Sequence, residues 1–389
     1  MIQTTQSLIS HLSCAKCETK YPHDQLQTFA TCCNQPLVAH YARGPVPKPD
    51  DLAKRETSMW RYTEMLPLLD QNNRVSLGEG MTPIIPLKKL AKEANIEHLY
   101  LKDEGLNPTG SFKARGLSMA ISKAKELGVT ECIIPTAGNA GGALSAYCAV
   151  AGIKATIVMP RKTPLIFQQE CQFYGAKLIL VDGLIDECGK LAHQITQDSG
   201  AFNVSTLKEP YRLEGKKTMG YEIAEQMNWQ LPDVILYPTG GGTGLLGIWK
   251  AFQEMRTLGW LTDQPLPKMI AVQTANCSPI VDLMNGIDSP PQSYTMSIAN
   301  GLSVPVAFGK DMIMQVLRAS NGGAMKVTEE EIKQGVYEIS AKEGILISPE
   351  GAAIWQALRR LAKAQKVLPH ERILLLNTGS GYKYLENLN

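Results

Sequence analysis

Lys113 ends the segment Asn107-Pro-Thr-Gly-Ser-Phe-Lys113, and its amine is a side-chain group that could do covalent chemistry. The segment follows a predicted strand and leads into a predicted helix over residues 114–126, which places Lys113 in the first helical turn. The dipole of a helix disfavours a cation at its N-terminus, so it lowers the pKa of the amine. A neutral lysine amine is a nucleophile that forms a Schiff base with an aldehyde. Taken alone, the position also fits a solvated lysine without a chemical role.

Two further loops of small and polar residues follow predicted strands. Residues 136–142 read Thr-Ala-Gly-Asn-Ala-Gly-Gly, and residues 378–381 read Thr-Gly-Ser-Gly. Asn139 offers both a donor and an acceptor to a flat ligand, and Thr378 offers a hydroxyl to a ring nitrogen. Either loop could also be an ordinary turn. They indicate a ligand site only in combination with the other loops at the same edge of a sheet.

Another loop is rich in glycine and enters a predicted helix over residues 245–255. It consists of Gly240, Gly241, Gly242, Thr243 and Gly244. Backbone N–H groups at the start of a helix suit a phosphate. The loop also begins a GxGxxG pattern, but the next predicted strand ends without the acidic residue that holds a ribose, which disfavours a nicotinamide-dependent oxidoreductase. A lysine amine, a phosphate loop and loops for a planar ring together indicate pyridoxal phosphate.

The elements that must position these loops are short apolar runs separated by helical patterns. Each run is nearly continuous, as in strands of a parallel sheet that are covered on both faces. Helical patterns lie between them, for example over residues 143–151 and 164–174. The alternation predicts an α/β fold, in which ligands bind at the carboxyl ends of the strands. The predicted strands are residues 99–102, 132–135, 155–159, 178–181, 234–237, 269–272 and 373–376.

Charge and hydropathy narrow the class of protein. The chain of 389 residues has 39 Lys and Arg against 37 Asp and Glu, a net charge of +2. Without a basic run, this balance gives no electrostatic case for nucleic acid or for an anionic membrane. No apolar run is long enough to span a bilayer, and residues 1–10 lack the pattern of a secretory signal. We therefore expect a cytoplasmic enzyme that binds neither nucleic acid nor membrane.

Four of the nine cysteines crowd into the first 33 residues. They are Cys14, Cys17, Cys32 and Cys33. The Cys-x-x-Cys spacing of the first pair is half of a zinc ribbon, and the residues from Cys33 onward resemble the second half. That half should carry a cysteine where this chain has Ala30, and adjacent ligands such as Cys32 and Cys33 rarely close a tetrahedral site. The four are therefore weak zinc candidates, with His23 as a substitute ligand, and a ribbon that folds without metal is the alternative.

The remaining cysteines lie in apolar surroundings, and we expect them to be core residues. They are Cys132, Cys148, Cys171, Cys188 and Cys277.

Together, these motifs resemble those of the threonine synthases, a family of fold type II pyridoxal-phosphate enzymes. The resemblance also includes Leu77-Gly-Glu-Gly-Met-Thr-Pro83 and Tyr211-Arg-Leu-Glu-Gly-Lys-Lys-Thr218, and it spans roughly residues 77–382. It implies an α/β fold like that of the tryptophan synthase β-subunit, with two open α/β domains and parallel sheets. We expect a zinc-ribbon-like subdomain over residues 1–45, a large cofactor-binding domain over 46–115 and 213–389, and a small α/β domain over 116–212.

The resemblance also implies a role for each motif. Lys113 would carry the cofactor and move protons, Asn139 would bind its phenolic oxygen, and Thr378 its pyridine nitrogen. The loop Gly240–Gly244 would bind the cofactor phosphate. Arg212 would bind the phosphate of the substrate, because a guanidinium can donate two parallel hydrogen bonds to a phosphate. Weaker candidates for substrate binding are Lys208, Ser205 and Thr136.

The implied reaction converts O-phospho-L-homoserine and water into L-threonine and phosphate, in a homodimer. Two positions depart from the pattern of many relatives: Ala114 replaces an aspartate, and Ala140 replaces a threonine whose hydroxyl is expected to help bind the substrate carboxylate. Because of these departures, β-elimination or β-replacement, as in a serine/threonine dehydratase or cysteate synthase, is the alternative reaction. A non-catalytic binding protein is disfavoured by Lys113 and the loops that accompany it.

Overall fold

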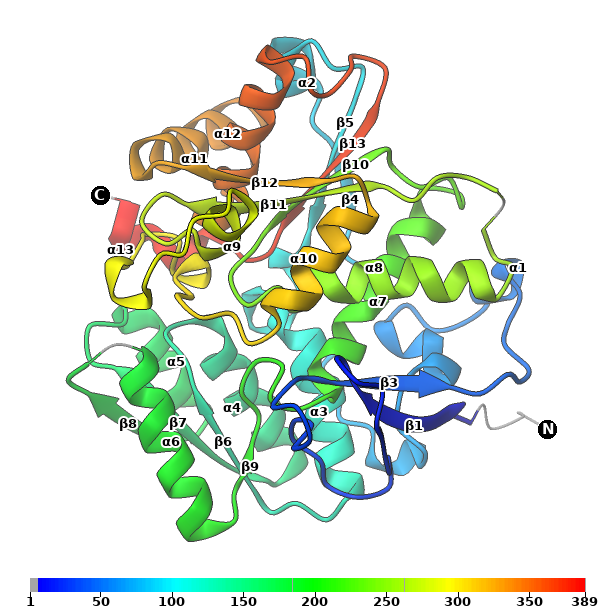
Figure 1. Cartoon of the computed structure of the whole chain (residues 1–389), viewed down its shortest axis with the longest axis vertical. Coiled ribbons are helices and arrows are strands. Elements are labelled where there is room, and N and C mark those ends of the chain that lie inside the picture. Colours follow the sequence, from blue (N-terminus) through cyan, green and yellow to red (C-terminus); the bar gives the residue numbers. More distant parts are fainter. Residues whose placement is uncertain (1–5, 184, 262, 389) are drawn as a thin grey trace. The chain divides into compact units, whose positions relative to one another are not determined.

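The computed structural model describes residues 6–183, 185–261 and 263–388. The chain divides into two compact units (Figure 1). The first unit comprises Met1–Met81 and Lys113–Thr218, and the second comprises Thr82–Phe112 and Met219–Asn389. Among the described helices, none combines the length and the apolar character needed to cross a membrane.

The main sheet of the first unit is parallel and has four strands. Their order is β8 (Lys177–Val181), β7 (Lys154–Pro160), β6 (Glu131–Pro135) and β9 (Phe202–Asn203). Alternate residues of the sheet face different helices. Ile133 and Val158 pack with Cys188 of helix α6, whereas Ile157 faces Gly141 of helix α4. The helices of this unit are α1 (Pro49–Leu52), α3 (Lys113–Glu126), α4 (Asn139–Ala151), α5 (Leu165–Phe173), α6 (Ile185–Ser199) and the first half of α7 (Tyr211–Gln226).

The three strands predicted for this sheet, β6, β7 and β8, are all present, with one correction to their burial. Residues 178–181 form strand β8 as expected, but they are only half-buried and not covered on both faces. The reason is that β8 lies at the edge of the sheet, beside β7 alone. Helix α4 ends where expected, at Gly152, whose positive φ of 70° is the left-handed conformation that glycine adopts most readily.

The N-terminal residues form a separate antiparallel sheet within the first unit. Its order is β2 (Lys20–Tyr21), β1 (Ile9–Cys14) and β3 (Leu37–Tyr41). A small core supports it, made of Ile9, Leu12, Cys14, Ala30, Leu37 and Ala39.

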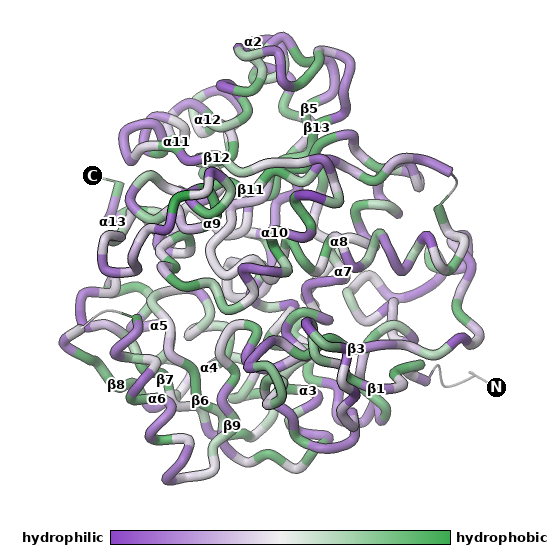
Figure 2. Tube along the Cα trace, viewed as in Figure 1, coloured by the Kyte–Doolittle hydropathy of each residue, from purple (hydrophilic) through white to green (hydrophobic). Residues whose placement is uncertain are grey.

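The second unit is built on a six-stranded sheet whose central strands are hydrophobic, as Figure 2 shows for β13. The order is β12 (Gly323–Val327), β11 (Lys268–Thr274), β10 (Val234–Pro238), β13 (Arg372–Asn377), β5 (His98–Asp103) and β4 (Ile84–Pro86). The sheet is parallel except for β4, which pairs antiparallel with β5. The sequence did not predict β12, because this half-buried edge strand lacks a continuous apolar run.

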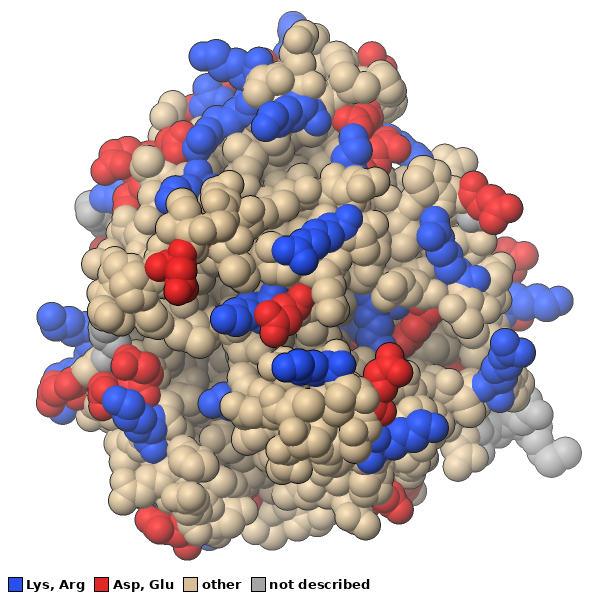
Figure 3. Space-filling view, viewed as in Figure 1, with Lys and Arg blue, Asp and Glu red and all other residues tan. Residues whose placement is uncertain are grey.

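Helices connect the strands of the second unit. They are the second half of α7, then α2 (Lys88–Ala94), α8 (Thr243–Thr257), α9 (Pro279–Met284), α10 (Lys310–Ala319), α11 (Glu329–Glu343), α12 (Pro349–Lys363) and α13 (Leu385–Leu388). Acidic and basic side chains are interspersed over the face of the molecule drawn in Figure 3, in keeping with the near-zero net charge.

The compact units do not follow the domain boundaries predicted from the sequence, and those boundaries stay a prediction. Residues 46–81, which we assigned to the large domain, pack within the first unit. The indole N–H of Trp60 donates to Glu79 at 2.8 Å and to Ser118 of α3 at 3.2 Å. This buried network ties the segment to α3.

Candidate active site

Lys113 is the first residue of α3 and is half-buried, so the expected position in the first helical turn is confirmed. The start of α7 packs closely against this turn. A Cβ atom on Gly215 would lie 2.1 Å from the carbonyl oxygen of Arg115, and one on Gly116 would lie 3.0 Å from Cε of Lys216. Glycine on both helices therefore brings the first turns of α3 and α7 together.

Arg212 lies in the first turn of α7 and is fully buried. Its Nη1 donates to the carbonyl oxygen of Val204 at 2.6 Å. Its Nε and Nη2 are buried and have no hydrogen-bond partner among the described residues. A buried guanidinium with two unpaired donors is costly, and an anionic group that accepts both would remove that cost.

Lys216 follows Arg212 by four residues and lies on the same side of α7. It is fully buried, and burial lowers the pKa of its ammonium group well below the usual range. The charges of Arg212 and Lys113 lower this pKa further. Three basic side chains therefore lie near one another at the start of α3 and α7, and a bound phosphate would favour their charged forms.

Glu209 lies two residues before the start of α7, and it is completely buried. Its Oε2 accepts from the backbone N–H groups of Tyr211 at 2.8 Å and Arg212 at 3.1 Å, so it caps the start of α7. Burial raises the pKa of Glu209 to about 7, against the opposing effects of Arg212 and the two N–H groups.

The other candidates in the first unit lie in the loops after β6 and β9. Asn139 is the first residue of α4 and is half-buried. Thr136 accepts from the backbone N–H of Gly138 at 3.3 Å, which stabilises the loop before α4. Ser205 donates to Oδ1 of Asn203 at 2.5 Å, and Lys208 is exposed. Arg212 thus differs from Lys208 in being buried.

The glycine loop belongs to the second unit and lies between β10 and α8. Gly242 has a φ of 77°, and no side chain caps the start of α8 at Thr243. A Cβ atom on Gly240 would lie 2.1 Å from the carbonyl oxygen of Gly301, and one on Gly244 would lie 1.8 Å from Oη of Tyr237. Only glycine fits at these two positions, so the loop presents bare backbone at a helix N-terminus.

Thr378 follows β13 in a turn that is fixed from several sides. Asn377 donates to Oδ1 of Asp103 at 2.7 Å and accepts from the hydroxyl of Ser348 at 2.9 Å. The N–H of Phe112 donates to the carbonyl oxygen of Thr378 at 3.1 Å. The Phe112 ring also meets Tyr237 edge-on, with centroids 6.3 Å apart. The residue before Lys113 therefore contacts both the Thr378 turn and the strand that leads into the glycine loop.

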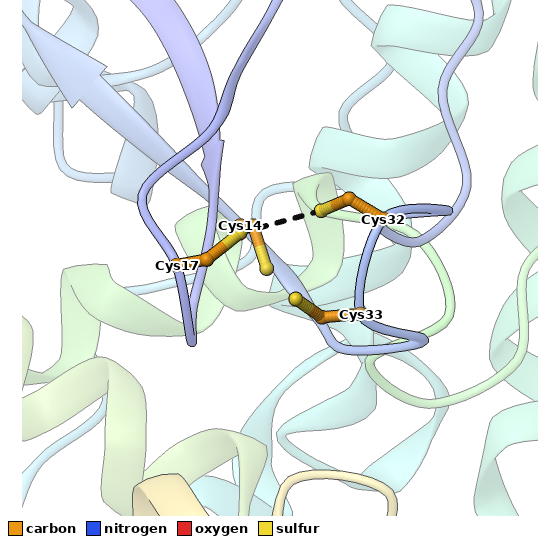
Figure 4. Close-up of side chains that lie close together, drawn as sticks. All are labelled: Cys14, Cys17, Cys32 and Cys33. Atoms are coloured by element: carbon orange, nitrogen blue, oxygen red, sulfur yellow. Dashed lines mark hydrogen bonds between the residues drawn. The ribbon is translucent and has the colours of Figure 1, made fainter.

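The four N-terminal cysteines come together although two of them are adjacent in sequence. Their sulfur atoms all lie within 4.8 Å of one another, and His23 is not in this group (Figure 4). All four are free thiols, so the described part of the chain holds a cluster that could bind a metal. The other five cysteines are buried, which confirms the expectation that they are core residues.

Sequence reasoning missed Lys216 and Glu209. Lys216 could have been found from its spacing, because residues four apart on a helix lie on the same side, and Arg212 was already a candidate. Glu209 gave no comparable indication. Its capping role depends on where α7 begins, and helix boundaries are poorly fixed by sequence alone.

Comparison with known proteins gives a consistent result. Residues 75–379 match the model of a family described as pyridoxal-phosphate dependent enzymes. The chain is 34% identical to a threonine synthase of Methanocaldococcus jannaschii, over 95% of this chain and 92% of the relative. It is 32% identical to a threonine synthase of Methanosarcina acetivorans, over 95% and 91%.

Solved structures share the fold. Maize serine racemase superposes with a TM-score of 0.67 at 21% identity, covering 79% of this chain and 93% of that one. The processed form of threonine deaminase isoform 2 from Solanum lycopersicum superposes with a TM-score of 0.65 at 20% identity, covering 79% and 82%. The match over most of the length shows that the chain belongs to the family of pyridoxal-phosphate-dependent enzymes that includes the threonine synthases.

Proposed function

We propose that this chain is a threonine synthase, which converts O-phospho-L-homoserine and water into L-threonine and phosphate. The observation that carries the proposal is the buried guanidinium of Arg212, whose Nε and Nη2 have no partner among the described residues. Lys216 adds a second buried basic side chain four residues later, and a bound phosphate would favour its charged form. Such a cluster suits a doubly charged phosphate ester and is not needed for a plain hydroxy amino acid.

The residues of the chain fit the cofactor that the family requires. Lys113 would hold the aldehyde carbon, Asn139 the phenolic oxygen and Thr378 the ring nitrogen. The phosphate would lie on the loop Gly240–Gly244, whose crowded glycines leave no space for side chains. When bound, pyridoxal phosphate supplies an electron sink for charge that develops on the substrate carbons.

The chain's own residues would bind the substrate and move its protons. Nζ of Lys113 would take a proton from the α-carbon and then from the β-carbon, and would return protons after the phosphate leaves the γ-carbon. Arg212 would hold the phosphate through Nε and Nη2 and stabilise its charge as the C–O bond breaks. Water then adds at the β-carbon, which gives threonine.

A dehydratase or a cysteate synthase is the alternative within the same family. Ala140 does not distinguish the two reactions, because the hydroxyl that it lacks is expected to help bind the carboxylate that all these substrates share. The backbone N–H groups at the start of α4 could take over that contact, since no side chain caps this helix.

The decisive experiment follows both products from O-phospho-L-homoserine. A threonine synthase releases phosphate and forms threonine in equal amounts. The same enzyme is then given L-threonine and L-serine, and formation of oxoacids is measured. Faster oxoacid formation than phosphate release, compared as kcat/KM, would reject the synthase and support the dehydratase.

We further propose that the enzyme works as a homodimer in the cytoplasm. The support for the location is that all nine cysteines are free thiols, as is usual in a reducing compartment. The mass of the native protein, measured by light scattering, tests the dimer. A single-chain mass across the working concentration range would contradict it.

A further inference from the structure

We propose that Cys14, Cys17, Cys32 and Cys33 bind one Zn²⁺ ion and that this site is structural, outside the catalytic chemistry. The four sulfur atoms lie within 4.8 Å of one another (Figure 4). Around a tetrahedral zinc with Zn–S bonds of about 2.3 Å, the sulfur atoms are about 3.8 Å apart. Cys17 and Cys32 are already 3.4 Å apart, so closure needs only small side-chain movements.

The first pair of ligands belongs to a tight turn at the end of β1. Cys14 is the last residue of the strand, and its sulfur accepts from the backbone N–H of Lys16 at 3.4 Å. Glu18 closes the turn with a positive φ of 61°, and its N–H donates to the carbonyl oxygen of Cys14 at 3.0 Å. An N–H bond to sulfur stabilises the thiolate form that metal binding requires.

The second pair belongs to a similar turn, and its geometry explains why adjacent cysteines can both serve. Ala30 and Gln35 form an antiparallel bridge that closes the turn, and Asn34 has a positive φ of 50°. Ala30, where a ribbon should carry cysteine, is fully buried in the small core. Cys32 and Cys33 lie in the turn itself, and Figure 4 shows both side chains pointing toward Cys14 and Cys17.

The chemistry of the donor set selects the metal. Four thiolates in a tetrahedral arrangement bind zinc or iron, and they are poor ligands for magnesium or calcium. A site with four protein ligands has no open position for water or substrate, so it is structural. The core under the N-terminal sheet contains few buried residues, and such small cores commonly need a metal or a disulfide for stability.

The zinc would also have a mechanical role in the first unit. Strand β3 ends at Tyr41, whose hydroxyl donates to Oε2 of Glu214 in α7 at 2.7 Å. Glu214 in turn pairs with Lys217 at 2.7 Å, and both side chains are fully buried. The N-terminal sheet therefore contacts the helix that carries Arg212. A metal that fixes the sheet would support the start of α7.

The test uses the full-length enzyme, purified without chelator and loaded with pyridoxal phosphate. Zinc and iron are measured in the wild type, in Cys32→Ser and in Cys188→Ala, the last being a buried cysteine far from the cluster in sequence. We expect about one zinc per chain in the wild type and in Cys188→Ala, and a loss of most of it in Cys32→Ser. Replacement by Co²⁺ should give the intense visible bands of tetrahedral thiolate coordination.

Thiol alkylation without reduction, read by mass spectrometry, keeps the proposal testable even if Cys32→Ser folds poorly. Zinc-bound thiols in the wild type should resist alkylation until a strong chelator is added. Wild-type protein without stoichiometric zinc, a Cys17–Cys32 disulfide, or iron with its coloured thiolate bands would each overturn the proposal. The cofactor absorbance reports separately on the catalytic site, so failure here is distinct from failure of the proposed function.

Discussion

Arg212 shows how a single side chain can indicate a ligand. Burial removes its guanidinium from water, yet among the residues that the structure describes Nη1 alone gains a hydrogen-bond partner, the carbonyl oxygen of Val204. Charged donors left without partners cost more free energy than neutral ones. The neighbouring Lys216 adds a second desolvated basic side chain, whose pKa is lowered by burial and by the charge of Arg212. A phosphate that accepts from both unpaired nitrogens would satisfy Arg212 and lower the repulsion within the cluster.

We expect Arg212→Gln to lower kcat/KM for O-phospho-L-homoserine about 100-fold, because two charge-assisted hydrogen bonds are lost. Lys208→Ala should have a much smaller effect, because Lys208 is exposed. Arg161→Gln is the matched control, since this arginine is exposed and already paired with Asp182 at 2.6 Å. Unchanged kcat/KM in Arg212→Gln, with normal cofactor content, would show that the phosphate binds elsewhere.

Glu209 gives a pH prediction with a definite sign. Its pKa rises from the usual 4.5 to about 7 in the folded protein, so between these values the folded state binds more protons than the unfolded state. Its contribution to stability is therefore present below pH 4.5 and is lost as the pH rises toward 7, at about 1.4 kcal/mol per unit of pKa shift.

The comparison is with Glu209→Gln, which keeps the oxygen that caps α7 but cannot ionise. The melting temperature of the wild type, relative to that of this variant, should fall as the pH rises from about 5 to 7. Thermal unfolding in a pH series measures the difference. A difference that stays constant or grows in favour of the wild type would refute the raised pKa.

At the scale of elements, strand ends and helix starts build the candidate site. The predicted strands around Lys113, Asn139, the glycine loop and Thr378 were all confirmed, because each is a continuous apolar run in a sheet interior. In the two larger sheets the errors fell at the edges, where β4, β9 and β12 were missed and β8 proved half-exposed. Edge strands have one neighbour and mixed burial, so their sequences carry a weaker pattern.

A substitution of Gly244, in the first turn of α8, tests whether the glycine loop binds the cofactor phosphate. We expect Gly244→Ala to lower the cofactor content of the purified enzyme severalfold, because the new Cβ would lie 1.8 Å from Oη of Tyr237 and displace the loop. Gly189→Ala, in a helical position where no described atom outside the neighbouring helix backbone lies within 4 Å of an added Cβ, should leave the content unchanged. Cofactor absorbance per chain measures both, and full occupancy in Gly244→Ala would exclude the loop as the phosphate site.

At the scale of the whole molecule, the proposed cofactor ligands come from both compact units. Lys113 and Asn139 belong to the first unit, whereas the glycine loop and Thr378 belong to the second. Phe112, the last residue of its segment in the second unit, bonds to Thr378 just before the chain enters the first unit at Lys113.

We expect pyridoxal phosphate to raise the melting temperature of the cofactor-free enzyme, because a ligand that binds only the folded state stabilises it. At a free concentration about 100 times the Kd, the linkage adds about 2.7 kcal/mol. Pyridoxal without phosphate should give a smaller shift because it lacks the group for the glycine loop, and Lys113→Ala should reduce the shift because the covalent link is lost. Equal shifts for both compounds would contradict the assigned phosphate site.

The sequence by itself determined the α/β class, the position of Lys113 at a helix start and the loops at the strand ends. Apolar runs determine strands and glycines determine turns through local interactions, so both can be predicted along the chain. It also indicated the four cysteines, but with doubt, because spacing alone cannot show where adjacent side chains point.

Only the tertiary structure revealed the burial of Arg212 and Lys216, the cap formed by Glu209 and the convergence of the four thiols. Each of these depends on packing between segments that are distant in sequence or on the exact start of a helix. Desolvation and convergence are properties of the packed chain, and no single stretch of residues encodes them.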